Sequence, residues 1–241
     1  MVGDDQGGAR GRLVDARPIP LRRFGPAGRH RTTARASRYR TLRGSASPAH
    51  GVNFTLPLED DLTVTLHEHR HMEEIYALID ANRAHLDTWF EWPAETRRPE
   101  DLRGFVDGSL AMFARGEGFH GGLRCSGRLV GGLSLHNVYR AEHRAEVGYW
   151  LAAAEQGKGI VTRAVRGLLD HLFTIEGFRR VEIRAISGNA ASRAVAERLG
   201  FTYEGTFRHI AYLRGEAVDH AVYSLLVDEW RTRRHAEEET P

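Results

Sequence analysis

Cysteine is almost missing from this chain, because Cys125 is the only one among 241 residues. A single cysteine excludes an internal disulfide and any zinc site built from several cysteines. Cys125 falls in an alternating, strand-like stretch, where a small buried hydrophobic side chain is more common than a reactive thiol. We therefore expect Cys125 to have a structural role.

Long apolar runs are also missing. No stretch approaches the ~20 apolar residues that a membrane helix needs, and the N-terminus has no apolar segment of the kind found in signal peptides. The hydrophobic share of 41% and the charged share of 27% are those of a soluble globular protein. We expect a cytoplasmic protein without a membrane partner, folded as one domain with a tail.

Acidic residues are scarce near the N-terminus. Residues 1–50 hold eleven arginines and three aspartates, a net charge of +8, so the remainder of the chain carries −6. The composition and the lack of periodicity predict a disordered basic extension over 1–52, a folded domain over 53–232 and a disordered tail over 233–241. The extension has no ordered aromatic platforms, so we expect no specific nucleic-acid partner. A start site placed too far upstream would also produce it, and Val52 is an alternative start.

From residue 62 onward, the hydrophobic periodicity predicts alternating strands and helices. Strands are expected at 62–66, 119–126, 128–139, 144–152, 180–186, 201–215 and 216–230, and helices at 72–86, 99–116, 160–173 and 189–199. The order is βααβββαβαββ. It predicts an α/β fold, with a mixed sheet and helices on both of its faces.

The segment "AEQGKGIVTRAV", residues 154–165, places Gly157 and Gly159 around Lys158, the only lysine, directly before a helix. A helix N-terminus suits an anion, and glycines let phosphate oxygens approach the backbone. A Walker A loop does not fit, because Lys158 precedes the second glycine, and a dinucleotide fingerprint would need a third glycine at Thr162. The segment is therefore compatible with a phosphate site, as many glycine turns before helices are, and it favours neither ATP nor NAD.

The segment "HEHRH" formally matches the zinc-protease pattern H-E-x-x-H through His67 and His71. That pattern binds zinc only on a helix, where both histidines share one face. Here the alternating strand "LTVTL" runs into it, and helical periodicity begins only near Met72. We expect no metal site.

The longer segment "EVGYWLAAAEQGKGIVTRAV" resembles the acetyl-CoA signature of GNAT N-acetyltransferases. Its Q-G-x-G form is common in the RimJ/RimL-like branch, and "IDANRAHLDTWFEW", "GNAASRAVAERLGF" and "YLRGEAVDHAVYSLL" extend the resemblance over about residues 60–230. The resemblance implies the GNAT fold, a mixed, mostly antiparallel sheet of six to seven strands. It also implies that the strand carrying Val147–Leu151 splays from the strand carrying Val181–Ile186.

The resemblance implies that acetyl-CoA is the co-substrate and that no metal is needed. The pyrophosphate would rest on the N–H groups of Gly157–Val161, with charge from Lys158 and Arg163, and the pantetheine arm would pair with the open strand edge near Tyr149. The cofactor-binding residues that we predict are Tyr149, Trp150, Leu151, Gln156, Gly157, Lys158, Gly159, Ile160, Val161, Asn189 and Ser192. Asn189 is expected to cap its helix on sequence grounds alone.

The resemblance makes Ser192 the acid that protonates the leaving thiolate, although first-turn serines also bond the local backbone. A backbone N–H around Gly148–Trp150 would hold the oxyanion. The branch often has an acidic base just before the tyrosine of "AYLRG", but here that position is Ala211. We predict Glu146 as the substitute, with Glu142 and His136 behind it; a solvated glutamate flanking the strand is the alternative reading.

The resemblance also implies that Trp89 and Trp92 stand where the family's acceptor-side helices meet the cleft. Tryptophans near a loop more often close a core, and the functional alternative is that one of them lines the acceptor pocket. The predicted function is acetyl transfer from acetyl-CoA directly to a primary amine, above all a protein N-terminus such as that of a ribosomal protein. One alternative is a weakly catalytic or non-catalytic module that binds acyl-CoA, which the Ala211 departure supports. The other is an acetyltransferase of small amines or antibiotics. The sequence leaves oligomeric state open, a homodimer included.

Overall fold

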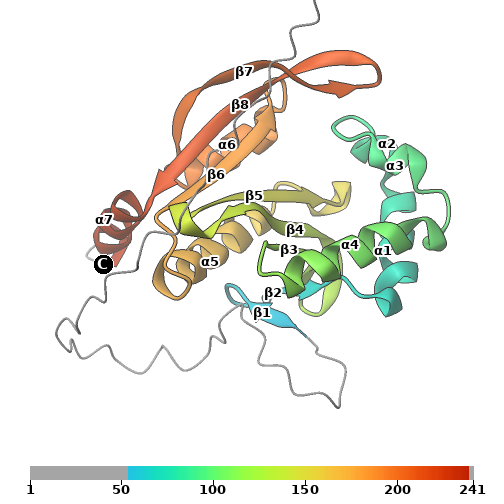
Figure 1. Ribbon diagram of the computed structural model, residues 1–241, viewed down its shortest axis with the longest axis horizontal. Coiled ribbons are helices and arrows are strands. Elements are labelled where there is room, and N and C mark those ends of the chain that lie inside the picture. Colours follow the sequence, from blue (N-terminus) through green and yellow to red (C-terminus); the bar gives the residue numbers. More distant parts are fainter. Residues whose placement is uncertain (1–53, 239–241) are drawn as a thin grey trace, which may run out of the picture. The chain divides into compact units, whose positions relative to one another are not determined.

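The computed structural model describes residues 54–238 (Figure 1). Within them, eight strands form one sheet in the order β1-β2-β3-β4-β5-β6-β8-β7. The strands are β1 (Thr55–Pro57), β2 (Leu62–Leu66), β3 (Phe119–Cys125), β4 (Arg128–Tyr139), β5 (Arg144–Leu151), β6 (Arg180–Ile186), β7 (Thr202–Leu213) and β8 (Glu216–Leu226). The mixed sheet is confirmed, and the predicted strand number is short by the edge strand β1, whose three residues are too few for a periodic pattern.

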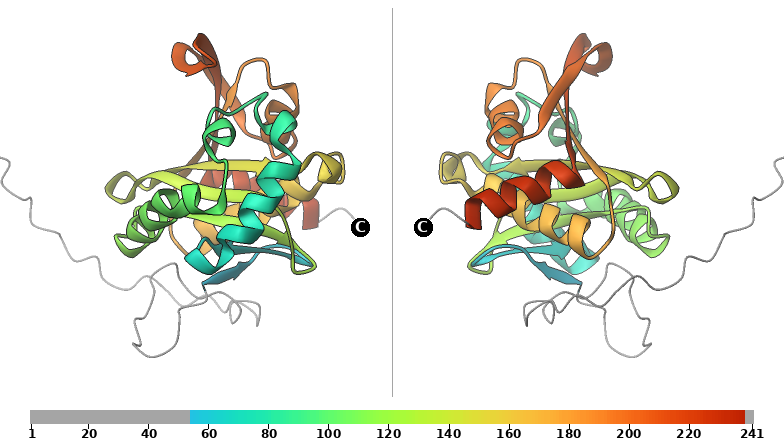
Figure 2. Two further views of the ribbon diagram at one scale, coloured as in Figure 1. Left: turned by 90° about the vertical axis from the view of Figure 1, so that its right-hand side faces the viewer. Right: turned by 90° about the vertical axis from the view of Figure 1, so that its left-hand side faces the viewer.

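Helices cover both faces of this sheet (Figures 1 and 2). The α-helices are α1 (Met72–Ala81), α2 (Arg83–Leu86), α3 (Trp92–Glu95), α4 (Arg103–Ala114), α5 (Ile160–Thr174), α6 (Ala190–Arg198) and α7 (Val227–Glu238). Short 3-10 turns precede α1 at His69–His71 and α4 at Pro99–Leu102, and others lie at Arg140–Glu142 and Ala153–Glu155. None of the helices in residues 54–238 is both long and apolar enough to cross a membrane.

The two faces have separate cores. The larger core joins buried side chains of β2 to β6 and β8 with α5 and α6, including Val147, Val165 and Leu168. The smaller core joins α1 and α4 with Leu129 and half-buried Trp150. Because successive side chains of a strand point to opposite faces, Trp150 lies on the α1 face while Val147, Tyr149 and Leu151 lie on the α5 face.

The strands β5 and β6 are parallel neighbours along only three residue pairs. Arg144 pairs with Arg180, Ala145 with Val181 and Glu146 with Glu182. Beyond Glu146, β5 continues against β4 alone, to Leu151. β6 continues against β8 alone, to Ile186. The predicted splay is therefore confirmed, and it begins directly after Glu146.

The C-terminal end differs from the prediction. Strand β8 ends at Leu226 and α7 begins at Val227, so the last four residues of the predicted strand are helical. Trp230 is buried, with its ring centroid 6.3 Å from that of Phe173, and its indole N–H donates to Asp170 at 3.1 Å. Residues 233–238, expected in a disordered tail, belong to α7. The tertiary contacts of Trp230 account for a helix whose own sequence is strongly polar.

Cys125 is half-buried at the edge of the larger core rather than fully buried as expected. Its thiol donates to the Asp61 carboxylate at 3.1 Å. This hydrogen bond, together with burial, raises the pKa of the thiol. The expected structural, unreactive character of Cys125 agrees with that shift. The predicted extension over 1–52 lies outside the described residues.

Candidate functional site

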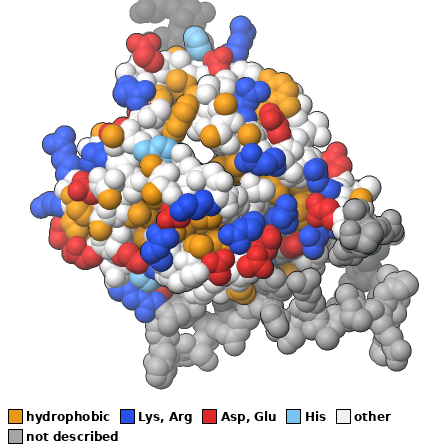
Figure 3. All heavy atoms as spheres, turned by 180° about the vertical axis from the view of Figure 1, so that it is seen from behind, with side chains coloured by type: hydrophobic (Ala, Val, Ile, Leu, Met, Phe, Trp, Pro, Cys, Tyr) orange, Lys and Arg blue, Asp and Glu red, His pale blue; other side chains and the backbone are white. Residues whose placement is uncertain are grey.

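A cleft of about 1470 Å³ opens where β5 and β6 part. Its walls come from α2 and α3, β4 and β5, the glycine loop, the β6–α6 segment and the β7–β8 hairpin. A hollow is visible near the centre of the surface in Figure 3, with hydrophobic side chains at its rim and charged ones farther out. Of the predicted site residues, the cleft brings together Glu146, Tyr149, Trp150, Leu151, Gln156, Gly157, Gly159, Ile160, Val161, Asn189, Ser192, Trp89 and Trp92. Lys158 does not line it.

The free edge of β5 presents backbone groups to this cleft. The Gly148 carbonyl accepts from the Ser134 hydroxyl of β4 at 3.2 Å, and Ala152 N–H donates to Val130 on the same side. Because backbone groups alternate along a strand, the N–H and C=O groups of Val147, Tyr149 and Leu151 point to the gap left by β6. The predicted oxyanion donor within Gly148–Trp150 is thereby narrowed to the Tyr149 N–H.

The glycine loop ends in an uncapped helix. Gly157 has φ 73° and Gly159 has φ 72°, a left-handed conformation that favours glycine, and a Cβ on either would meet open space. Gly159 is the N-cap of α5, and no side chain of the described chain caps it. The first N–H groups of α5 have no intrahelical acceptor, so they are available to an anion.

The two cations expected to support the anion are used elsewhere. The Lys158 ammonium pairs with Glu155 at 3.0 Å, and the Arg163 guanidinium pairs with Asp60 at 3.3 Å and Asp61 at 3.5 Å. Arg198, at the end of α6, does line the cleft. Sequence reasoning missed Arg198 because nothing in the local pattern distinguishes it from a solvated helix arginine.

The start of α6 holds Ser192 beside Tyr149. Asn189 is the N-cap, as predicted, and its side-chain oxygen accepts from the Ser192 N–H at 3.0 Å. The Ser192 hydroxyl and the Tyr149 hydroxyl lie 3.1 Å apart, and Tyr149 also donates to the Ser192 carbonyl at 3.1 Å. Burial raises the pKa of Tyr149 to about 12, so the phenol keeps its proton and fixes the Ser192 side chain.

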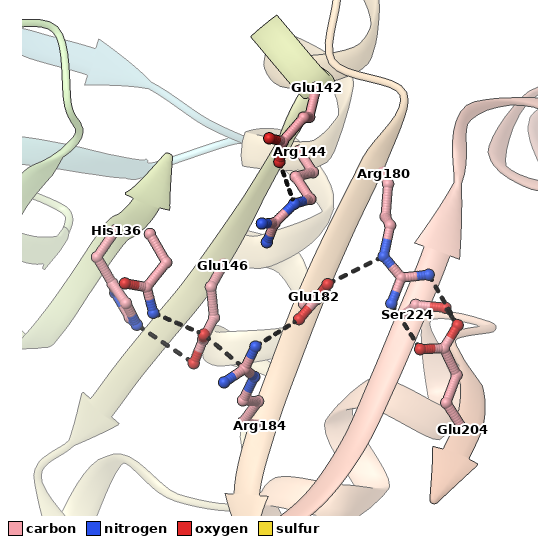
Figure 4. A network of polar contacts seen from close by, with 10 residues as sticks. His136, Glu142, Arg144, Glu146, Arg180, Glu182, Arg184, Glu204 and Ser224 are labelled. Carbon is pink, nitrogen blue, oxygen red and sulfur yellow. Dashed lines mark hydrogen bonds and ion pairs between the residues drawn. The ribbon is translucent and has the colours of Figure 1, made fainter. Parts of the chain in front are cut away.

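Glu146 lies in a row of ion pairs across the strands (Figure 4). Its carboxylate is 3.3 Å from His136 Nε2 and from Arg184 Nε, and it accepts from the Asn137 amide at 3.0 Å. Burial alone would raise its pKa, but the hydrogen bonds from His136 and Asn137 and the charge of Arg184 outweigh burial and lower the pKa. A carboxylate with a lowered pKa and occupied oxygens is a weak candidate for a general base.

The two residues placed behind Glu146 are no better as bases. Glu142 is exposed, bonds Arg144 at 2.8 Å and does not line the cleft. His136 lines the cleft, but its Nε2 faces Glu146 and its Nδ1 lies 3.3 Å from the Ser134 hydroxyl. Ala211, where the branch often has an acid, lines the cleft without a titratable group. Each of the three residues predicted for the base thus already has a side-chain partner.

The predicted tryptophans differ in their surroundings. Trp92 packs between Phe90, at a ring-centroid distance of 5.6 Å, and Trp150, at 5.9 Å. The Trp150 indole lies across Gly132, where an added Cβ would come within 2.2 Å of its Nε1. Trp89 lines the cleft outside this aromatic row. Trp92 and Trp150 therefore help to build the wall on the α1 face, which is opposite to the face of Tyr149.

Hydrogen bonds close the cleft at two ends. On one side, Asn82 Oδ1 accepts from the Ala153 N–H at 2.9 Å, and His85 Nε2 lies 3.1 Å from Gln156 Nε2. On the other side, the tip of the β7–β8 hairpin bonds the α2–α3 segment: the Arg214 N–H donates to Glu91 at 2.8 Å, and its guanidinium donates to the Asp87 carbonyl. Partners 71 to 127 residues apart carry no sequence signal, so these bridges were missed.

The H-E-x-x-H segment does not form a metal site. His67 follows β2 and His71 lies in a 3-10 turn, so the two do not share one face of a regular helix. Burial lowers the pKa of His67 to about 3, with a further contribution from His120. Among residues 54–238, no group of three or more His, Cys, Asp or Glu is arranged to hold a metal ion.

Comparison with known proteins decides the family. The model of the "Acetyltransferase (GNAT) domain" family matches residues 61–202. The protein belongs to the GNAT acetyltransferase family. The "Putative ribosomal N-acetyltransferase YdaF" of Bacillus subtilis is 36% identical over 178 residues, which cover 73% of this chain and 97% of the relative.

Two solved structures share the fold of this GNAT protein. RimL, a ribosomal L7/L12 alpha-N-protein acetyltransferase in complex with coenzyme A, has a TM-score of 0.68 and 29% identity over 73% of this chain and 99% of RimL. The microcin C7 self-immunity acetyltransferase MccE, in complex with acetyl-CoA and AMP, has a TM-score of 0.66 and 30% identity over 70% of this chain and 93% of MccE. The predicted membership in the RimJ/RimL-like branch is confirmed, and the protein is an N-acetyltransferase that uses acetyl-CoA.

Proposed function

We propose that this GNAT enzyme acetylates protein N-terminal amines, with a ribosomal protein as the acceptor. The observation that carries the proposal is that neither position expected to hold the base offers a free carboxylate. Ala211 stands at the usual acidic position, and the Glu146 carboxylate is engaged by His136, Asn137 and Arg184. An α-amino group with a pKa near 7.8 is roughly a quarter neutral at pH 7.4, whereas a lysine amine is only about 0.1% neutral. A cleft without a strong base therefore suits an N-terminal amine. The names of YdaF and RimL support a ribosomal acceptor, and such an acceptor would place the reaction in the cytoplasm.

The geometry supports direct transfer across the gap. The first N–H groups of α5 would bind the pyrophosphate of acetyl-CoA, and the open edge of β5 would pair with the pantetheine arm. The Tyr149 N–H would stabilise the oxyanion that forms on the thioester carbonyl. Ser192, held by the Tyr149 hydroxyl at 3.1 Å, would protonate the departing sulfur. The acceptor would enter from the opposite face, past Trp89 and the Phe90–Trp92–Trp150 row.

A small-molecule amine is the second candidate acceptor, because MccE, whose name describes a self-immunity enzyme, has a similar fold and identity to those of RimL. A weakly catalytic module that binds acyl-CoA is the third candidate, supported by Ala211.

A screen that follows release of the CoA thiol tests all three candidates. Wild-type protein is given acetyl-CoA with peptides that have free N-termini, the same peptides with blocked N-termini and an internal lysine, polyamines, and aminoglycosides. We expect fast thiol release only with free N-termini. Preferred turnover of polyamines or aminoglycosides would move the function to small amines, and tight binding of acetyl-CoA without release from any amine would indicate the module.

A further inference from the structure

On the acceptor face of the cleft, one imidazole has no hydrogen-bond partner among residues 54–238. This inference rests on the proposed function, because it concerns how the acceptor amine loses its proton. Glu146 and His136 are tied to each other and to Arg184, Asn137 and Ser134. Away from this network, His85 contacts Gln156 and Glu91 accepts from the hairpin tip.

His220 differs from all of these groups. It lines the cleft from β8, and no hydrogen bond joins its ring to any other residue in 54–238. In the sheet it pairs with Ile186 of β6 on one side and with Phe207 of β7 on the other. A ligand that bonds the half-buried ring would therefore displace no hydrogen bond from another described residue. Two further cleft residues, Glu95 and Tyr212, are exposed at the rim, on α3 and near the hairpin tip.

The sheet register places His220 on the acceptor face. Residues directly opposite one another in a ladder share a face, and the ladders align Glu146 with Glu182, Arg184 with Val222, and Ile186 with His220. His220 therefore projects from the same face as Glu146 and Trp150. Tyr149, which holds Ser192, projects from the other face. Acid and base would then stand on opposite sides of the splayed gap.

The charges that face His220 keep it available as a base. Burial lowers the pKa of His220. The negative charge of Glu146 on β5 raises this pKa and the positive charge of Arg184 on β6 lowers it, and the net effect is a lowered pKa. Phe207 of β7, which lies opposite, is apolar and also contacts the Arg184 guanidinium at 5.3 Å from its ring centroid. At neutral pH the imidazole is therefore uncharged and has a lone pair.

We propose that His220 accepts the proton that the acceptor amine loses when its nitrogen attacks the thioester carbonyl. The C–N bond forms and the C–S bond breaks, the amine proton passes to His220, and the sulfur takes the hydroxyl proton of Ser192. His220 then releases its proton to solvent, and Ser192 regains one from solvent. The products are the acetylated amine and free CoA thiol, so the reaction needs no further reactant. In this role His220 of β8 replaces the acidic residue that the branch often has at the position of Ala211, on the neighbouring strand β7.

The test compares His220→Gln with His209→Gln in the full-length chain. His209 is exposed in the same hairpin, and its ring has no hydrogen-bond partner in 54–238, while its backbone N–H donates to Asp219 at 2.8 Å. It is therefore a matched control. With an N-terminal peptide as acceptor, we expect His220→Gln to lower kcat about 10²-fold, as for loss of a general base. Affinity for acetyl-CoA should stay within twofold, because that ligand binds the other face. Added imidazole should partly restore turnover. The rise of kcat/KM with pH, which lies below the ordinary histidine value of 6.5 because the pKa of His220 is lowered, should become shallower.

Each outcome separates this inference from the proposed function. Turnover and a pH profile equal to those of His209→Gln would overturn the role of His220 and leave N-terminal acetylation intact. A loss of turnover with an unchanged acid limb and no imidazole rescue would mean a purely structural role, which also contradicts the inference. Absence of thiol release from the wild type with every amine would contradict the proposed function and the inference together.

Discussion

Ser192 is placed so that its hydroxyl and its backbone serve different purposes. Its N–H completes the Asn189 cap and its hydroxyl meets Tyr149. Replacing Ser192 with alanine keeps the N–H and removes only the hydroxyl. We expect Ser192→Ala to reduce kcat by 10- to 100-fold, at the lower end of the usual effect of acid–base groups because water can protonate a thiolate. Affinity for acetyl-CoA, measured by calorimetry, should change less than twofold.

Tyr149→Phe provides the companion measurement to Ser192→Ala. If Tyr149 only holds Ser192, its loss should lower kcat by a smaller factor than the loss of Ser192 itself, and the double variant should be no slower than Ser192→Ala. Equal turnover of wild type and Ser192→Ala would remove Ser192 from the mechanism.

Glu146 was predicted as the base, and its surroundings argue for a different role that pH can reveal. Its pKa is lower in the folded chain than its ordinary value of 4.5. Because the pKa of Glu146 is lower in the folded state than in the unfolded state, the ionised carboxylate stabilises the fold at pH values above the unfolded-state pKa. This stabilisation is lost as the pH falls through the folded-state pKa. We therefore expect Glu146→Gln to flatten the decline of unfolding free energy below about pH 4.5, measured by urea titration.

The control for Glu146→Gln is Glu142→Gln, whose exposed pair with Arg144 should contribute little. At neutral pH, Glu146→Gln should retain measurable turnover. A fall in kcat larger than that of His220→Gln would return the role of base to Glu146.

At the scale of the elements, the glycine loop has to adopt a left-handed backbone and to leave room for an anion. Comparing two glycine substitutions separates these two requirements. In Gly159→Ala, the left-handed φ of 72° costs about 1–2 kcal/mol, and the new Cβ enters space where the pyrophosphate would lie. Gly215→Ala at the hairpin turn, with φ 78°, also projects into open space and has the same backbone cost outside the cleft. We expect similar losses of thermal stability but at least tenfold weaker binding of acetyl-CoA only for Gly159→Ala. Equal affinities would contradict a phosphate site at this loop.

Most elements could be predicted because local patterns determine them. The alternation in "LTVTL" and the apolar face of residues 160–173 correspond to β2 and α5. The Asn189 cap and the left-handed glycines of the loop are also local features. The strand β1 and the helix α7 were missed because they depend on pairing with β2 and on the burial of Trp230.

The candidate site could also be predicted only where local patterns determine it. Its backbone and glycine positions follow from the motif, whereas the state of a side chain follows from partners far away in the sequence. Glu146 depends on Arg184, and Lys158 on the buried Glu155. The state of His220 depends on burial and on Glu146 and Arg184 of neighbouring strands, which no local motif encodes.

At the scale of the whole molecule, the cleft is closed by contacts between the α2–α3 segment and the tip of the β7–β8 hairpin. Arg214 supplies both hydrogen bonds of that bridge, to Glu91 and Asp87, but only one uses its side chain. Arg214→Ala removes the guanidinium bond and keeps the backbone bond. We expect faster amide exchange over 203–213 and a several-fold higher KM for the acceptor peptide, because a looser wall must be ordered when the acceptor binds.

Arg208→Ala is the control for Arg214→Ala, since Arg208 is exposed on β7 of the same hairpin and lies outside the cleft lining. The proposed acetyl-CoA site lies between β5, α5 and α6, away from the bridge, so neither variant should change the affinity for acetyl-CoA by more than twofold. A KM for the acceptor that is equal in both variants would show that the bridge does not shape the acceptor side. A parallel loss of acetyl-CoA affinity in Arg214→Ala would instead mean that the two sides of the cleft move together, and the hairpin would then control both substrates.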